Sequence, residues 1–235
     1  MVPSREVSET TQYYVMWCGV PQPDRKRRMW QALRDDFEPA PLKGMAPIRG
    51  LARAGLYTIL ERLEVAAELG DYAALVRDAE AMFLPMADSA PGTLWEEPRA
   101  IYALCHAIGC GAGGILTEEV LGIRTGLPLR IAPHGGGTLR WCKGHVTTPK
   151  GRVDVAWDWQ KDRYQLRVSI PDGTTAEVVL PTEARTIWQS APANKENPWR
   201  ETIVIRNHTL IVVEPGRLSG VEPKTAVQTL GLAPK

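Results

Sequence analysis

The feature that most constrains the fold is a change in the spacing of apolar residues near residue 127. Before that point apolar side chains recur every three or four residues, the spacing of a helix with one buried face. After it they recur every second residue, the spacing of a strand with one buried face. Because the two patterns follow one another and do not alternate, the sequence predicts a helical part followed by a β part.

The clearest helix begins after Gly70, where Asp71 stands in the position of an N-cap. One apolar stripe then follows the helical spacing: Tyr72, Leu75, Val76, Ala79, Met82, Phe83 and Met86. A second stripe comprises Met29, Trp30, Leu33 and Phe37. The basic residues around that second stripe are typical of a solvated helix face: Arg25, Lys26, Arg27, Arg28 and Arg34. Residues 49–69 and 100–116 are apolar or small on several sides, which favours close packing.

The β part is indicated by alternating residues such as Val153, Val155, Trp157 and Trp159. Around eight short strands without helices favour an antiparallel β-sandwich. We therefore expect a multidomain α and β chain with a helical domain over residues 1–126, a β-sandwich over 127–215 and a tail over 216–235. Trp157 and Trp159 share a face with the valines, so we expect them to pack in the core.

Composition excludes several classes of function. The chain has 28 basic and 27 acidic residues, so its charge gives no reason to expect nucleic acid or an anionic membrane as a partner. We find no signal-peptide pattern and no apolar run long enough to span a bilayer, which favours the cytoplasm. Motifs for nucleotide cofactors are absent, so no cofactor is expected. Cys105 and Cys110 flank His106, but nothing completes four ligands, so no metal site is expected.

A candidate site for sugar chemistry lies at Trp95, Glu96 and Glu97. An indole face can stack on a pyranose ring, and a carboxylate can deprotonate water or accept hydrogen bonds from sugar hydroxyls. The structural alternative makes Trp95 a core side chain and the two glutamates first-turn acids of a helix. His106, inside a predicted small-residue helix, either faces the same cavity or is a core histidine bonded to the backbone.

Three segments, taken in order, resemble the C-terminal third of the bacterial α-L-rhamnosidases, glycoside hydrolase family 78. GLYTILERLEVAAELGDYAALVRDAEAMFLPMADSAPGTLWE is similar to late helical hairpins of the family's (α/α)6 domain, which end in Trp-Glu. CHAIGCGAGGILTEEVLGI resembles the next helix, with Cys105 where the family has asparagine before its histidine. LRIAPHGGGTLRWCKGHVTTPKGRVDVAWDWQ and the residues after it resemble the C-terminal β-domain.

This resemblance implies an inverting hydrolase of terminal α-L-rhamnosides, in which Glu96 is the general base and His106 helps to bind rhamnose. Trp95 and Glu97 become further substrate contacts. It also implies a partial (α/α)6 toroid of about five or six helices, whose open edge needs self-association or a companion chain. The family's general-acid segment has no counterpart before Glu96. An alternative is a non-catalytic carbohydrate-binding or interaction module with a tryptophan such as Trp141, Trp157 or Trp159 on its surface.

Overall fold

The computed structural model describes residues 7–36, 51–52, 56–89, 92–96, 104–160, 163–172, 174, 176–179, 187–190, 201–205 and 210–213. They fall into two compact units. The helical unit lies within residues 1–115 and includes 136–138, and the β unit lies within 116–135 and 139–235. The predicted tail, 216–235, lies outside the described residues, and the predicted boundaries at 126 and 215 stay predictions. No helix in the described ranges is both long and apolar enough to cross a membrane.

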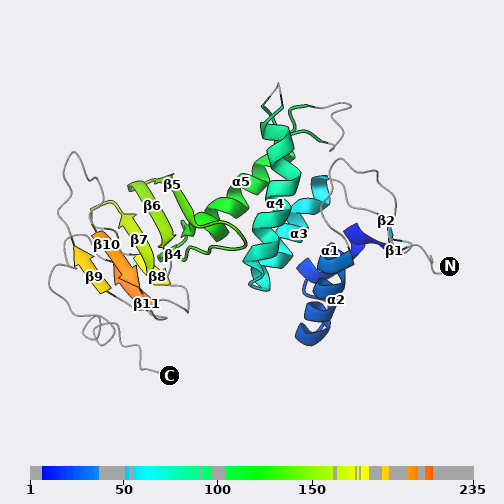
Figure 1. The fold of residues 1–235 in the computed structure, drawn as a ribbon, viewed down its shortest axis with the longest axis horizontal. Coiled ribbons are helices and arrows are strands. Elements are labelled where there is room, and N and C mark those ends of the chain that lie inside the picture. The colour runs from blue at the N-terminus through cyan, green and yellow to red at the C-terminus, as the bar shows by residue number, and fades with distance from the viewer. Residues whose placement is uncertain are drawn as a thin grey trace. The chain divides into compact units, whose positions relative to one another are not determined.

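The helical unit contains the five α-helices of the chain's described part (Figure 1). A short parallel pair of strands, β1 and β2, accompanies them. The elements are β1 (Val7–Ser8), α1 (Glu9–Trp17), α2 (Pro23–Asp36), β2 (Leu51–Ala52), α3 (Leu56–Glu68), α4 (Tyr72–Ala87), the 3-10 turn η1 (Ala107–Gly109) and α5 (Cys110–Ile115). The predicted change from helices to strands is confirmed, while the toroid stays a prediction.

Helix α4 begins where the sequence predicts. The Asp71 carboxylate accepts a hydrogen bond from the backbone N–H of Ala74 at 3.2 Å, which satisfies a donor left free at the helix start. Its buried residues are Ala74, Leu75, Val76, Asp78, Ala79, Met82 and Met86, which include most of the predicted stripe. The additions are Ala74 and Asp78, and Asp78 is a charged side chain with no exposed surface.

The charge of Asp78 is balanced by Arg62 of α3, which is 1% exposed and lies where four helices meet. Arg62 Nε donates to Asp78 Oδ2 at 2.6 Å, and its Nη1 lies 3.3 Å from Glu9 Oε1 of α1. The same nitrogen donates to the Tyr13 hydroxyl, and the guanidinium carbon lies 5.3 Å from the centre of the Trp30 ring of α2. One buried cation therefore connects α1, α2, α3 and α4.

The protonation states around Arg62 follow from this packing. Burial raises the pKa of Tyr13 far above its usual value, so the phenol stays protonated and donates to Glu9 Oε1 at 2.5 Å. Burial alone would lower the pKa of Arg62, but the neighbouring Tyr13 and Asp78 outweigh that effect and the pKa is raised. The cluster is therefore an ion pair with hydrogen bonds, not a set of neutralised groups.

Helix α2 corrects one expectation. Trp30 and Leu33 are buried as predicted, and Arg25, Arg27 and Arg28 are exposed, but Lys26 is only 5% exposed. Its ammonium group lies 2.5 Å from Glu68 Oε2 at the end of α3. An ion pair thus allows one member of the basic run to be buried. Phe37 lies outside the described residues.

The β unit starts with a π-helical turn, η2 (Leu116–Leu121), and continues as two sheets. One sheet has the order β5-β6-β7-β10-β9, from Trp141–Thr148, Gly151–Gln160, Arg163–Ser169, Glu201–Ile205 and Ile187–Ser190. The other has the order β11-β8-β4-β3, from Leu210–Val213, Ala176–Val179, Leu129–Ile131 and Ile123–Arg124. All pairs are antiparallel except β4 with β8, and the sandwich arrangement stays a prediction.

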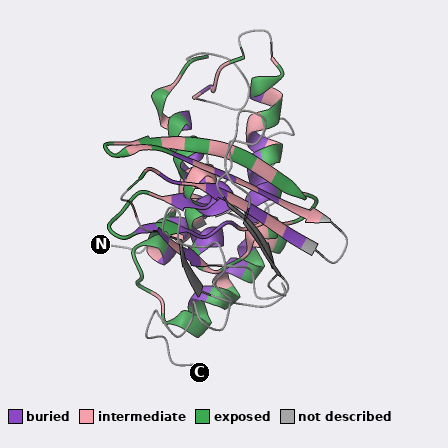
Figure 2. Ribbon diagram, turned by 90° about the vertical axis from the view of Figure 1, so that its left-hand side faces the viewer, coloured by how far each residue is buried: buried purple, intermediate pink, exposed green. Residues whose placement is uncertain are grey.

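Burial alternates along these strands, as Figure 2 shows by colour. Val153, Val155 and Trp157 of β6 are at most 1% exposed, and the Trp157 indole N–H donates to the carbonyl of Val120 at 2.9 Å. Trp159 is half-buried against Tyr164, with ring centres 4.8 Å apart. Both tryptophans therefore pack inward as predicted, which leaves Trp141 as the exposed one of the three.

The buried cluster around Arg62 generates a stability prediction. Arg62→Ala removes the cation but leaves Asp78 and Glu9 buried, so we expect the free energy of unfolding to fall by about 3–5 kcal/mol. Urea unfolding followed by circular dichroism at the helical signal measures the change. Arg27→Ala is the matched control, because Arg27 is 68% exposed and its carboxylate partner is 3.8 Å away. Equal losses in both variants would contradict the assignment.

Candidate functional site

The loop that carries Glu96 is anchored to the core by its neighbour Trp95. Trp95 is 7% exposed and packs with Ile59, Met82 and Met86 of α3 and α4. Its backbone N–H also points at Met86 Sδ, 3.5 Å away. The burial matches the structural alternative for Trp95, and a sugar contact by its ring stays a prediction. The anchored indole fixes the backbone from which Glu96 projects.

Glu96 itself is half-buried and directly follows this anchor. A half-buried carboxylate is accessible to a ligand and still held by its surroundings, which suits a group that must accept a proton. Glu97, the other predicted carboxylate, lies outside the described residues. The roles proposed for these two glutamates therefore stay predictions.

His106 differs from its predicted place inside a helix. It is the N-cap of η1, with extended backbone angles, and its Nδ1 accepts a hydrogen bond from the N–H of Ile108 at 3.3 Å. The imidazole takes the capping role that serine or aspartate usually fills. Since Nδ1 acts as the acceptor, the proton of the neutral ring lies on Nε2, which makes Nε2 a donor.

Backbone pairing brings the two predicted segments together. The N–H of His106 donates to the carbonyl of Leu94 at 2.8 Å. The Thr93 hydroxyl donates to the carbonyl of Leu104. Residues 93–94 and 104–106 therefore run side by side, and this pairing places the segment of Glu96 against the segment of His106. The structure thus brings together the two segments to which Glu96 and His106 belong.

Two glycines make this arrangement possible. A Cβ on Gly109 would lie 2.5 Å from the Cβ of Leu94, and a Cβ on Gly111 would lie 2.7 Å from Leu60 Cδ1. Both distances are shorter than real contacts, so the helical turn after His106 can approach the loop and α3 only without side chains there. Close packing, as the sequence predicts, therefore accounts for Gly109 and Gly111, whereas nothing lies within 4 Å of the Cβ positions of Gly113 and Gly114.

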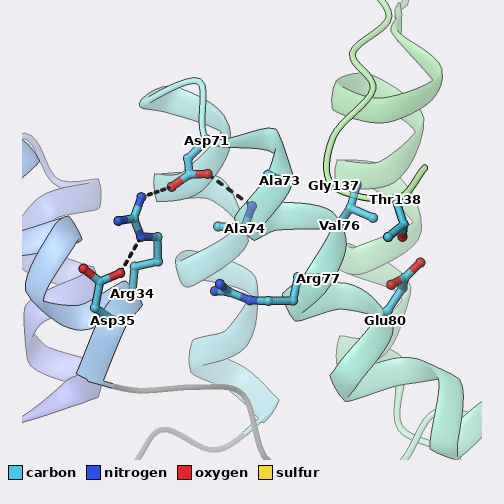
Figure 3. Close-up of a pocket in the computed structure, with 10 residues that line it drawn as sticks. All are labelled: Arg34, Asp35, Asp71, Ala73, Ala74, Val76, Arg77, Glu80, Gly137 and Thr138. Carbon is cyan, nitrogen blue, oxygen red and sulfur yellow. Dashed lines mark hydrogen bonds and ion pairs between the residues drawn. The ribbon is translucent and has the colours of Figure 1, made fainter. Parts of the chain in front are cut away.

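A separate pocket of about 480 Å³ opens between α2 and the first half of α4 (Figure 3). Asp71 accepts from the Trp30 indole at 2.9 Å and from Arg34 at 3.2 Å. Burial raises the pKa of Asp71, but these hydrogen bonds outweigh it and the pKa is lowered. Arg77 and Glu80 line the same pocket. The sequence predicts only a capping role for Asp71 and gives no sign of this pocket, because the walls of the pocket come from helices far apart in sequence.

The described residues contain no group of three or more histidine, cysteine, aspartate or glutamate side chains arranged to hold a metal ion. Cys105 and Cys110, which flank His106, are both exposed and reduced. A carboxylate such as that of Glu96 and an imidazole such as that of His106 are groups that can transfer protons and form hydrogen bonds.

Comparison with known proteins finds a similarity between part of the β unit and a recognised domain family. Residues 128–193 match the bacterial alpha-L-rhamnosidase C-terminal domain. Over 84 residues, 34% of this chain, the sequence is 30% identical to an alpha-L-rhamnosidase of Alteromonas sp. (strain LOR). The chain covers only 9% of the length of that relative.

Solved structures extend the likeness in fold to most of the chain. The GH78 family rhamnosidase of Bacillus sp. GL1 matches with a TM-score of 0.63 and 23% identity, over 76% of this chain and 19% of its own. The alpha-L-rhamnosidase of Dictyoglumus thermophilum matches with a TM-score of 0.61 and 16% identity, over 88% of this chain and 25% of its own. At these identities the structures establish the shared fold alone.

The contact between Gly109 and Leu94 is directly testable. We expect Gly109→Ala to lower the free energy of unfolding by about 1–3 kcal/mol, because the added methyl group must displace the loop that carries Glu96. Gly113→Ala is the control, since nothing lies within 4 Å of its Cβ position and alanine favours helix by up to about 1 kcal/mol. Urea unfolding of both variants makes the comparison. If Gly109→Ala were as well tolerated as Gly113→Ala, the close approach would be wrong.

Proposed function

Because this chain is a relative of the bacterial α-L-rhamnosidases of glycoside hydrolase family 78, we propose that it serves the hydrolysis of terminal α-L-rhamnosides with Glu96 as general base. The observation that supports the proposal is the backbone pairing of Leu94 with His106, which brings the loop of the Trp-Glu motif beside the turn that begins at His106. The domain match over residues 128–193 supports the same family.

The proposed reaction proceeds with inversion. Glu96 removes a proton from a water molecule as its oxygen attacks the anomeric carbon from the side opposite the leaving group. A second carboxyl group protonates the departing oxygen, and such pairs stand about 6.5–9.5 Å apart so that water fits between sugar and base. His106 donates from Nε2 to an oxygen of the sugar and so orients the ring.

We propose that the general acid comes from outside these 235 residues. The segment that carries it in the family has no sequence counterpart before Glu96, and Glu97 is adjacent to Glu96. The chain also spans 19–25% of the length of the two solved relatives named above, which supports a contribution from further sequence.

Exposed apolar side chains on and beside α1 support the proposal that another polypeptide packs against the helices. Tyr14 and Trp17 of α1 are 40% and 53% exposed, and Val20, which follows the helix, is 69% exposed. The two aromatic rings form an edge-on pair with centres 6.4 Å apart. Apolar residues gathered on one helix face are typical of a surface that meets another helix. We propose that self-association or a companion chain covers this face and completes the toroid.

The alternative function is a non-catalytic carbohydrate-binding or interaction module. The exposure of Trp141, at 67%, favours it as a specific observation. The two functions differ in one consequence: the module binds sugar without turnover, whereas the hydrolase loses turnover when Glu96 is changed.

Hydrolysis of p-nitrophenyl α-L-rhamnopyranoside tests the role of Glu96. This substrate suits the chain because p-nitrophenolate departs without help from a general acid. We expect slow turnover that falls by about 10²–10⁴-fold in Glu96→Gln, since a general base contributes that much. Glu118→Gln is the control, because Glu118 is exposed and lies outside the site.

Chemical rescue separates a catalytic role from a structural one. In Glu96→Ala, added azide should attack the anomeric carbon in place of water and give the β-L-rhamnosyl azide, the product of inversion. An α-configured azide would contradict inversion. Turnover that survives unchanged in Glu96→Gln would remove Glu96 as the base, and turnover absent from every protein tested would favour the binding module.

A further inference from the structure

The outward face of the five-stranded sheet carries an aromatic side chain among hydrogen-bonding groups. Strand register places Trp141 of β5 opposite Asp158 of β6, and Asp158 opposite Gln165 of β7. The next outward row has Lys143 and Arg167 on either side of Ala156. Directly opposite residues share a face, so these side chains form one surface, which we call the Trp141 face.

This face points away from the core of the β unit. The residues between those of the Trp141 face include Val155, Trp157 and Leu166, which are buried on the other side of the sheet. Along β5 exposed and half-buried residues alternate without any buried one (Figure 2). Trp141, at the start of this strand, is 67% exposed. Strand β5 lies at the end of the sheet order, so a ligand can reach the indole from the side as well as from above.

The Trp141 face contains a hydrogen-bond acceptor that no other described residue satisfies. Asp158 Oδ1 is buried and has no hydrogen-bond partner in the described part of the chain. A buried carboxylate oxygen without a partner costs free energy, which a bound hydroxyl group would recover. Lys143 and Arg167 supply donors nearby, and Gln165 already accepts from Arg167 at 3.2 Å. Donors and an acceptor therefore surround one open aromatic ring.

We propose that the Trp141 face binds an uncharged pyranoside, with the sugar stacked on the Trp141 indole and its hydroxyls bonded to Asp158, Lys143 and Arg167. Sugar hydroxyls both donate and accept, so they match a face of mixed sign. The C–H side of a pyranose matches the indole. This second sugar contact rests on the proposed function only for the choice of sugar, because it contains neither Glu96 nor His106.

Two other classes of partner fit the face less well. A nucleic acid would meet the carboxylates of Asp154 and Asp158 between the cations, and Arg152 is already paired with Asp154 at 2.6 Å. A protein interface needs a cluster of large apolar side chains at its centre. Trp141 is the single large apolar side chain among the outward described residues of β5, β6 and β7.

Saturation-transfer NMR with methyl α-L-rhamnopyranoside and methyl β-D-glucopyranoside tests the proposal on the full chain. We expect transfer to the sugar C–H protons, with affinity about tenfold weaker in Trp141→Ala. Asp158→Asn, which keeps the shape but removes the charge, should also weaken binding. Trp17→Ala is the matched control, since Trp17 is 53% exposed on α1 and should leave binding unchanged.

Repeating the titration in Glu96→Gln separates this inference from the proposed function. The effect of Trp141→Ala should persist there, even if the chain hydrolyses nothing. Binding that survives Trp141→Ala but disappears in Glu96→Gln would place the sugar at the candidate active site and overturn the proposal. A wild-type chain that binds neither glycoside would also overturn it, as would single-stranded DNA that binds through Trp141 in place of sugar.

Discussion

The helical unit depends on the neutralisation of one buried cation. Arg62 cannot be left unpaired away from water, so the carboxylates of α1 and α4 and the aromatic rings of α1 and α2 have to converge on α3. The relative positions of α3 and α4 then define the apolar site made by Ile59, Met82 and Met86, in which Trp95 is seated. The position of Glu96 thus depends on an ion pair, Arg62 with Asp78, whose members lie 34 and 18 residues earlier in the sequence.

Backbone contacts, more than side-chain contacts, hold the two segments of the candidate site together. A carbonyl of the loop accepts from the backbone of His106, and a glycine lets the next turn approach that loop closely. A main-chain contact keeps its geometry when neighbouring side chains change. Such an assembly is compatible with a fold that is shared with solved structures at only 16–23% identity.

Regular periodicity made much of the fold predictable. The apolar stripe from Tyr72 to Met86 correctly predicted a helix with one buried face, α4. The alternation of apolar residues in β6 correctly predicted a strand with one buried face. The position of His106 was wrong, because helix interior and N-cap differ only in backbone angles that the composition of residues 100–116 does not reveal. The burial of Lys26 and Asp78 was not predicted for another reason. Each is buried because it pairs with a residue of a different helix, and the spacing of residues within one helix carries no information about that partner. The pairing of the Glu96 and His106 segments was expected only through family resemblance.

The placement of β5 at the end of its sheet has a consequence for the behaviour of the protein in concentrated solution. An eight-residue strand paired on one side in the described sheet presents free backbone donors and acceptors, the template on which a second chain can add a strand and begin to aggregate. Lys143 and the exposed His145 lie in the middle of that strand and oppose such addition by charge and hydration. Colloidal stability and ligand recognition would then rest on the same row of side chains, so a change that makes the strand more apolar would alter both together.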